Sequence, residues 1–156
     1  MKAPFRKILC PTDLSPIGNL AIPTAYLLAA SGGTVILAHV EPPPNTGNPL
    51  YPEERPKDAP TPQQLEARKQ DLRAKLTALV PADAKARNIT TQVELLTGED
   101  VPLSLETAAK ASKAEVIVLG THGRVGLARI VHGESLANRL VHRSDLDVIL
   151  VHSDRP

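Results

Sequence analysis

Residues 114–141 read AEVIVLGTHGRVGLARIVHGESLANRLV, and this stretch decides the fold. It opens with a mostly apolar run typical of a buried strand and closes with a segment typical of a helix. Gly120, Gly123 and Gly133 lie between the two. Such a segment is where α/β proteins bind phosphate, because glycine lets the backbone approach a ligand and a helix start offers free N–H groups. The Gly-x-x-Gly-x9-Gly spacing matches neither the P-loop nor the dinucleotide-binding fingerprint.

Strands and helices alternate along the rest of the chain. Apolar runs and helix-start signals predict strands at 8–10, 34–40, 89–96, 115–119 and 147–152, and helices at about 16–30, 62–79, 101–112 and 134–142. We expect Ser15 to cap the first helix, Pro23 to kink it and residues 31–33 to end it. The alternation predicts an α/β fold with one doubly wound parallel sheet, in a single domain over residues 1–156.

One segment breaks this alternation. Residues 41–62 carry eight prolines, a density that excludes a helix or a central strand. A structureless loop of this length is uncommon in a compact domain. Two interpretations are equally open: a flexible flap over the end of the second strand, and a tolerated surface insertion.

Composition limits the classes of function. Hydrophobic residues make up 42% of the chain, the net charge is +1 and aromatic residues are only 2%. A nucleic-acid partner is therefore not expected, since base stacking relies on aromatic rings and phosphate binding on positive charge. The single cysteine, Cys10, lies in the first strand, where we expect an inert buried thiol. We find no secretion signal and no apolar run of about 20 residues, and so expect a cytoplasmic protein without membrane association.

The polar ends of three predicted strands indicate the place of a site. They are Pro11-Thr12-Asp13, His39-Val40-Glu41 and the segment from Gly120 onward. Ligands of doubly wound sheets bind at the carboxyl ends of the strands where the winding reverses. If the first and fourth strands are neighbours, the carboxylate of Asp13 lies beside the glycine segment. The carboxylate can accept hydrogen bonds from ribose or adenine, and the N–H groups of the glycine segment can bind phosphates. Asp13 has an alternative role as a cap of the following helix.

Other chemistries find less support in the sequence. The histidines at 39, 122, 132, 142 and 152 fall on different elements without a familiar metal-ligand spacing, so we expect no metal site. The Gly-x-Ser-x-Gly motif is absent, and no residue stands out as a base that activates water. We therefore expect no enzyme, or at most a slow ATPase. The Thr121 hydroxyl is expected to bond to loop backbone, and Arg129 to lie at the surface.

Taken together, these residues resemble the universal stress protein family. The opening strand Ile8–Ser15 is similar to that of the family's ATP-binding branch, Ala38-His39-Val40 to its second strand, and the glycine spacing to its phosphate motif. The resemblance covers the chain apart from the proline-rich loop. It implies a Rossmann-like sheet of the adenine nucleotide alpha-hydrolase type, with strand order 3-2-1-4-5. It also implies a homodimer paired through the last strand, over Val148, Ile149, Leu150 and Val151.

The resemblance further implies a ligand and its contacts. The family binds ATP, usually with a divalent cation such as Mg²⁺, or another adenine nucleotide, and it acts in stress adaptation. Asp13 would lie near the adenosine beside Pro11 and Thr12, and the backbone of Val40 would contact adenine. The phosphates would be lined by Gly120, Gly123, Arg124, Gly133, Glu134 and Ser135. His122 lies in the same segment, and its position there makes it a further candidate for a hydrogen bond to the ligand.

Glu134 departs from the family pattern, in which a serine or threonine follows the last glycine. A carboxylate there suits the start of a helix but opposes a γ-phosphate. Two hypotheses follow. The protein is an ATP-binding homodimeric regulator, in which Ser135 supplies the hydroxyl or Glu134 points away. Alternatively, it is a nucleotide-independent dimeric interaction protein whose Glu134 fills the phosphate site, and Glu134→Ser would then create or strengthen ATP binding.

Overall fold

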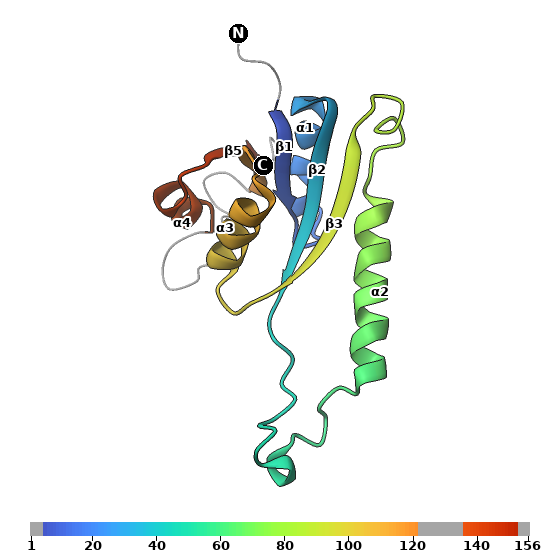
Figure 1. Ribbon diagram of the computed structural model, residues 1–156, viewed down its shortest axis with the longest axis vertical. Helices are drawn as coiled ribbons and strands as arrows, with labels where there is room; N and C mark the ends of the chain where they lie inside the picture. Colours follow the sequence, from blue (N-terminus) through green and yellow to red (C-terminus); the bar gives the residue numbers. More distant parts are fainter. Residues whose placement is uncertain (1–4, 122–135, 153–156) are drawn as a thin grey trace.

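The computed structural model describes residues 5–121 and 136–152 of the chain (Figure 1). Five parallel strands form one sheet in the order β3-β2-β1-β4-β5, which confirms the predicted topology. The strands are β1 (Phe5–Pro11), β2 (Ala29–Glu41), β3 (Thr90–Thr97), β4 (Val116–Thr121) and β5 (Asp147–His152). The helices are α1 (Ala21–Leu28), α2 (Pro62–Ala78), α3 (Val101–Ser112) and α4 (Leu136–Arg143), with short 3₁₀ turns η1 (Gly18–Leu20) and η2 (Pro52–Glu54).

Helices cover both faces of the sheet, as its winding requires. On one face, α1 packs on alternate residues of the central strands, such as Ile8 and Val118. On the other, α3 and α4 pack on the intervening residues, such as Leu9 and Ile117. The central strands are continuously buried over residues 8–11, 35–38 and 116–119. This is the pattern of parallel strands covered on both sides.

The first helix differs from the prediction. The α-helix begins only at Ala21, after η1, and it ends at Leu28. Ser15 is not its cap, because Leu20 holds the N-cap position of α1; the Ser15 Oγ instead accepts the Gly18 N–H at 3.0 Å, before the helix. The predicted kink at Pro23 was wrong, since Pro23 lies in the first turn of α1, where no N–H donor is needed.

Residues 31–33, predicted to end that helix, lie inside β2. They form an irregularity at which the pairing of β1 with β2 shifts between Phe5 and Lys7. Gly32 has a φ of +80°, and a Cβ at Gly33 would lie 2.9 Å from the carbonyl oxygen of Arg6. Glycine therefore allows the strand to bulge and continue, where we had expected glycine to end a helix.

The remaining elements agree closely with the sequence. α3 and β5 have the predicted bounds, and Thr61 with Gln64 forms a reciprocal capping box at the start of α2. β4 extends two residues further than predicted, so Gly120 and Thr121 belong to the strand. β3 is an edge strand, as its loose alternation indicated.

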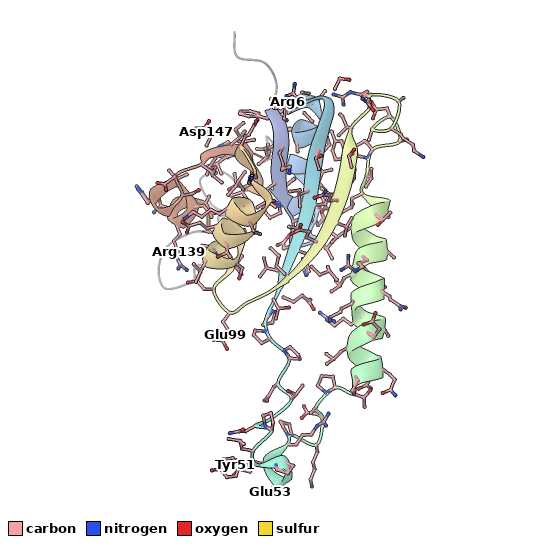
Figure 2. All side chains as sticks on the ribbon, in the orientation of Figure 1. Arg6, Tyr51, Glu53, Glu99, Arg139 and Asp147 are labelled. Carbon is pink, nitrogen blue, oxygen red and sulfur yellow. The ribbon has the colours of Figure 1, made fainter. Side chains whose placement is uncertain are left out.

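Residues 42–61, here called the proline arm, contain only the turn η2. The arm extends beyond the end of β2 and away from the sheet (Figure 1), with Tyr51 and Glu53 near its tip (Figure 2). It does not fold over the strand end, so the flap geometry was wrong. Leu50 is 81% exposed there. The exclusion of a helix or central strand is confirmed.

Candidate functional site

The carboxyl ends of β1, β2 and β4 meet, as predicted. β1 lies between β2 and β4 in the sheet. Beyond the end of β1, the Thr12 N–H donates to the carbonyl oxygen of Ala38 at 2.9 Å, so the β1–β2 contact continues one residue past the strand. Pro11, Thr12 and the residues around Val40 therefore lie at one edge of the sheet, where the winding reverses.

The loop after β1 is tied by its own side chains. Thr12 Oγ1 accepts the Leu14 N–H at 3.0 Å and donates to Asn19 Oδ1 at 2.6 Å. Leu14 has a φ of +66°, a left-handed conformation that is uncommon for a residue other than glycine. Backbone strain of this kind, about 1 kcal/mol or more, persists only where the surroundings enforce it, and it gathers at functional sites.

Asp13 lies between Thr12 and Leu14 and is exposed. Its Oδ1 accepts the N–H of Ser15 at 2.9 Å, and it also accepts the Ser15 hydroxyl. These bonds close a local turn, and the N-cap position of α1 is Leu20, so the alternative role of Asp13 as a helix cap was wrong. The carboxylate nevertheless stands at the carboxyl end of β1, where a ligand of this fold class binds.

Gly120 has a packing reason to be glycine. A Cβ there would lie 2.2 Å from the carbonyl oxygen of Ile17 and 3.1 Å from that of Gly18. At Gly18 itself, a Cβ would meet Asp13 Oδ1 at 2.4 Å. The end of β4 and the loop that carries Asp13 are therefore in direct backbone contact, which fixes the carboxylate beside the start of the glycine segment.

At the carboxyl edge of the sheet, the face that α3 and α4 cover is apolar. Val40 is half-buried and packs with Leu96, Val101 and Leu136 against the core under α3 and α4. Thr121 is 2% exposed, and its hydroxyl has no hydrogen-bond partner among the described residues. The expected bond from Thr121 to loop backbone is thus not found in the described part of the chain. A buried hydroxyl without a partner costs about 1–3 kcal/mol, unless a ligand or another segment supplies one.

The rest of the predicted phosphate cradle lies outside the described residues. This applies to His122, Gly123, Arg124, Gly133, Glu134 and Ser135, and also to Arg129. On the far side of that segment, Arg139 on α4 donates to Asp100 Oδ2 at 2.8 Å, while Asp100 Oδ1 accepts the Leu103 N–H at the start of α3. The two helix starts are thereby joined at the carboxyl edge of the sheet.

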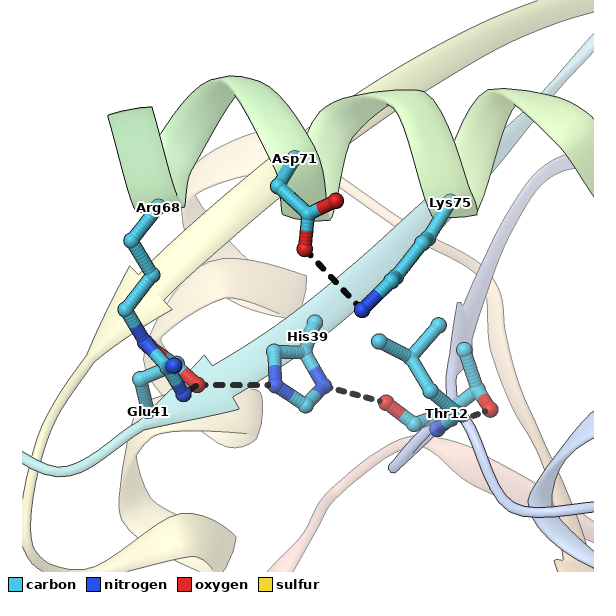
Figure 3. A network of polar contacts seen from close by, with 7 residues as sticks. Thr12, His39, Glu41, Arg68, Asp71 and Lys75 are labelled. Carbon is cyan, nitrogen blue, oxygen red and sulfur yellow. Dashed lines mark hydrogen bonds and ion pairs between the residues drawn. The ribbon is translucent and has the colours of Figure 1, made fainter. Parts of the chain in front are cut away.

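A polar chain that the sequence did not reveal runs along the other side of this edge (Figure 3). His39 Nδ1 lies 2.9 Å from the carbonyl oxygen of Thr12, and its Nε2 lies 3.4 Å from Glu41 Oε1. Arg68 on α2 binds both Glu41 oxygens, at 2.6 and 2.7 Å. Hydrogen bonds from Arg68 are the main cause that lowers the pKa of Glu41. The only sequence signal was the alternation of His39 and Glu41, which puts them on one face of β2.

Other features of the described residues point to no second chemistry. An open groove of about 600 Å³ runs between β3 and α3, lined among others by Lys7, Glu94 and Lys113. Its lysines lie toward the amino end of the sheet, away from the edge that carries Asp13. Within 5–121 and 136–152, no three metal-binding side chains are grouped to hold an ion. No helix in that part of the chain is long and apolar enough to cross a membrane.

Comparisons with known proteins agree with this fold. Three solved structures match over nearly their whole length. A universal stress protein in complex with cAMP has 22% identity and a TM-score of 0.65, over 98% of this chain and 100% of that one. A family member from Burkholderia pseudomallei has 21% identity and a TM-score of 0.65, over 95% and 96%. A universal stress protein from Archaeoglobus fulgidus in complex with dAMP has 17% identity and a TM-score of 0.54, over 96% and 98%.

No curated protein matches the chain. The model of the universal stress protein family, in contrast, matches residues 4–152. That range includes every element of the sheet and both loops that form the candidate site. The chain therefore belongs to the universal stress protein family.

Proposed function

We propose that this protein binds an adenine nucleotide at the carboxyl edge of β1, β2 and β4. The observation that carries the proposal is the loop after β1, in which the exposed Asp13 carboxylate lies beside Gly18, the residue that lies against the end of β4. Asp13 provides an acceptor for the hydroxyl or amino donors of a nucleoside. The glycine segment that follows β4 in the sequence provides backbone N–H groups for phosphate.

The residues present fit such a ligand. Val40 is only half-buried at the carboxyl end of β2, so part of it stays open to a base. The buried Thr121 hydroxyl, without a partner among the described residues, offers a hydrogen bond at the end of β4. Two structures with this fold hold cAMP and dAMP, which share the adenine base. An adenine nucleotide is thus the ligand class that both the residues and the relatives favour.

The finer parts of the proposal concern the ligand's phosphates and the protein's role. We propose ATP with Mg²⁺ as the ligand and regulation under stress, in the cytoplasm, as the role. Asp13 and the glycine segment would then bind and orient the nucleotide without catalysing a reaction. Hydrolysis assays on the same samples test this last point, because ATP turnover above a slow background would contradict a purely regulatory role.

The second part of the proposal is a homodimer through β5. β5 is an edge of the sheet, and its residues Val148–Val151 are half-buried and apolar. An apolar sheet edge normally needs pairing or cover. Sedimentation at tens of micromolar tests this part: a dimer is expected, and a monomer at every concentration would refute it.

Isothermal titration calorimetry tests the nucleotide site. ATP, ADP, AMP and cAMP are titrated into the protein with and without Mg²⁺. We expect saturable binding of at least one nucleotide, and at least tenfold weaker binding to Asp13→Ala, a loss of about 1.4 kcal/mol. Asp58→Ala, an exposed change on the proline arm, is the matched control and should bind normally. Absent heat with all four ligands, or equal affinity for wild type and Asp13→Ala, would refute the site.

A further inference from the structure

Thr12, the residue before Asp13, is held by its N–H, its hydroxyl and its carbonyl oxygen. Thr12 donates its N–H to Ala38 and uses its hydroxyl to bind Leu14 and Asn19. Its carbonyl oxygen lies 2.9 Å from His39 Nδ1. Because the peptide bond is planar, a contact that fixes this carbonyl also fixes the N–H of Asp13. His39 thus acts directly on the backbone that presents the Asp13 carboxylate.

Both ring nitrogens of His39 face acceptors. Nδ1 faces the Thr12 carbonyl oxygen and Nε2 faces the Glu41 carboxylate. A neutral imidazole has one N–H and one lone pair, so either tautomer satisfies one contact and sets a lone pair against an oxygen in the other. Only the imidazolium donates to both. Both contacts are therefore hydrogen bonds only when the ring carries two N–H groups.

Charged groups from three elements surround His39. On its own strand, Glu41 stays a carboxylate because Arg68 binds it with two short hydrogen bonds. The side chain of His39 is 12% exposed and that of Glu41 is 22% exposed, which limits screening of their attraction. On α2, Asp71 and Lys75 form an ion pair at 2.9 Å, so their opposite charges largely cancel at His39 (Figure 3). Asp13, one residue beyond Thr12, adds a further negative charge at the end of β1.

We propose that His39 is a positioning residue of the nucleotide site: its imidazolium bridges the Thr12 carbonyl and the Glu41 carboxylate, and so sets the backbone of Asp13 for binding. This inference rests on the proposed function for its ligand. It adds a residue that acts through Thr12, without touching the nucleotide, and a dependence of affinity on proton concentration. Loss of the proton turns the Nε2 contact with Glu41 from attraction to repulsion and loosens the bridge.

Two measurements between about pH 5.5 and pH 8, where histidine titrates, test the inference. The first is NMR of the ligand-free protein. The amide signals of Asp13 and Leu14 should shift with the imidazole signals of His39 in wild type. The pH-dependent shift of these two signals should be absent in His39→Gln, because the glutamine side chain can donate to the Thr12 carbonyl but carries no charge. His142→Gln, an exposed change on α4, should keep it.

The second measurement is the affinity for cAMP, chosen because a phosphodiester does not titrate in this range. Hydrogen bonds to charged groups are stronger than neutral ones, so wild type should bind cAMP about fivefold more weakly at the high end of the range. His142→Gln should follow wild type, and His39→Gln should show a flat profile.

The outcomes separate the two proposals. The role of His39 is overturned if the amide signals of Asp13 and Leu14 do not change with pH in wild type. It is also overturned if these signals change with pH equally in His39→Gln. An equal fivefold pH dependence of cAMP binding in His39→Gln also overturns it. If no adenine nucleotide binds at any pH, the proposed function fails, and the amide titration alone then decides whether His39 sets the Asp13 backbone. The wild-type titration needs no variant, so a poorly folded His39→Gln does not prevent the test.

Discussion

The contact between β4 and the Asp13 loop makes Gly120→Ala a sharp perturbation. The new Cβ would lie 2.2 Å from the Ile17 carbonyl oxygen, and real Cβ contacts essentially never fall below 3.0 Å, so backbone must move by at least about 0.8 Å. Gly120 does not have a positive φ, so alanine fits its backbone and the clash is isolated. Overpacking against backbone costs about 1–3 kcal/mol, and alanine recovers up to about 1 kcal/mol of chain entropy.

We therefore expect Gly120→Ala to lower the free energy of unfolding by about 2 kcal/mol, which for a chain of this length is a fall in Tm of about 4–8 °C. Thermal unfolding followed by circular dichroism measures it. Gly98→Ala is the matched control: its Cβ would meet Ser104 Oγ at 2.1 Å, a hydroxyl that can rotate away, so we expect about 1 kcal/mol or less. If the two variants unfold at the same temperature, the packing explanation of Gly120 fails.

Three further predictions follow from single contacts. Burial raises the pKa of the Cys10 thiol to about 12, so thiol reagents at pH 8 should label it only as fast as the chain unfolds; rapid labelling of native protein would contradict this. Arg68 lowers the pKa of Glu41, so this pair stabilises the fold above the ordinary glutamate pKa and loses its effect as pH falls through the lowered value. Arg68→Met should thus cost about 0.5–1 kcal/mol at pH 7 in urea unfolding, and this cost should shrink as the pH falls below the ordinary glutamate pKa. A cost independent of pH would refute the assignment. Thr121→Val removes a buried hydroxyl and keeps the shape of the side chain, so the free energy of unfolding should stay the same or rise by up to about 1 kcal/mol. The same change should weaken nucleotide binding in calorimetry. A clear loss of stability would mean that the hydroxyl is already hydrogen-bonded in the free protein.

Much of the fold was predictable because it depends on local patterns. Continuous apolar runs marked the central strands, and the capping residues Thr61 and Asp100 marked the starts of α2 and α3. The alternation of elements then indicated one parallel sheet with right-handed crossovers. Its strand order, 3-2-1-4-5, came from the resemblance to the universal stress protein family. The edge that carries Pro11, Thr12, Asp13 and Val40 followed from that topology, since the carboxyl ends of neighbouring parallel strands meet.

The errors came from contacts between segments that are distant in sequence. Residues 31–33 look like a helix end, but pairing with β1 turns them into a bulge, and only that pairing shows why Gly33 approaches Arg6. Likewise, Arg68 reads as one more charge on the solvent face of α2. Its two bonds to Glu41 arise because α2 returns beside the end of β2 after the proline arm (Figure 3). The residue pattern within one helix or strand reveals neither the pairing of β1 with residues 31–33 nor the contact between Arg68 and Glu41.

The central claim is that an adenine nucleotide binds at the edge formed by β1, β2 and β4. The most direct measurement is an NMR titration of the backbone amides with ATP and Mg²⁺. A nucleotide at this edge should give saturable shifts concentrated at Thr12–Ser15, Val40 and Gly120–Thr121. Lys7 and Lys113, beside the groove of β3 and α3, should be unaffected. Shifts centred on that groove, or no saturable shift at high ATP concentration, would contradict it.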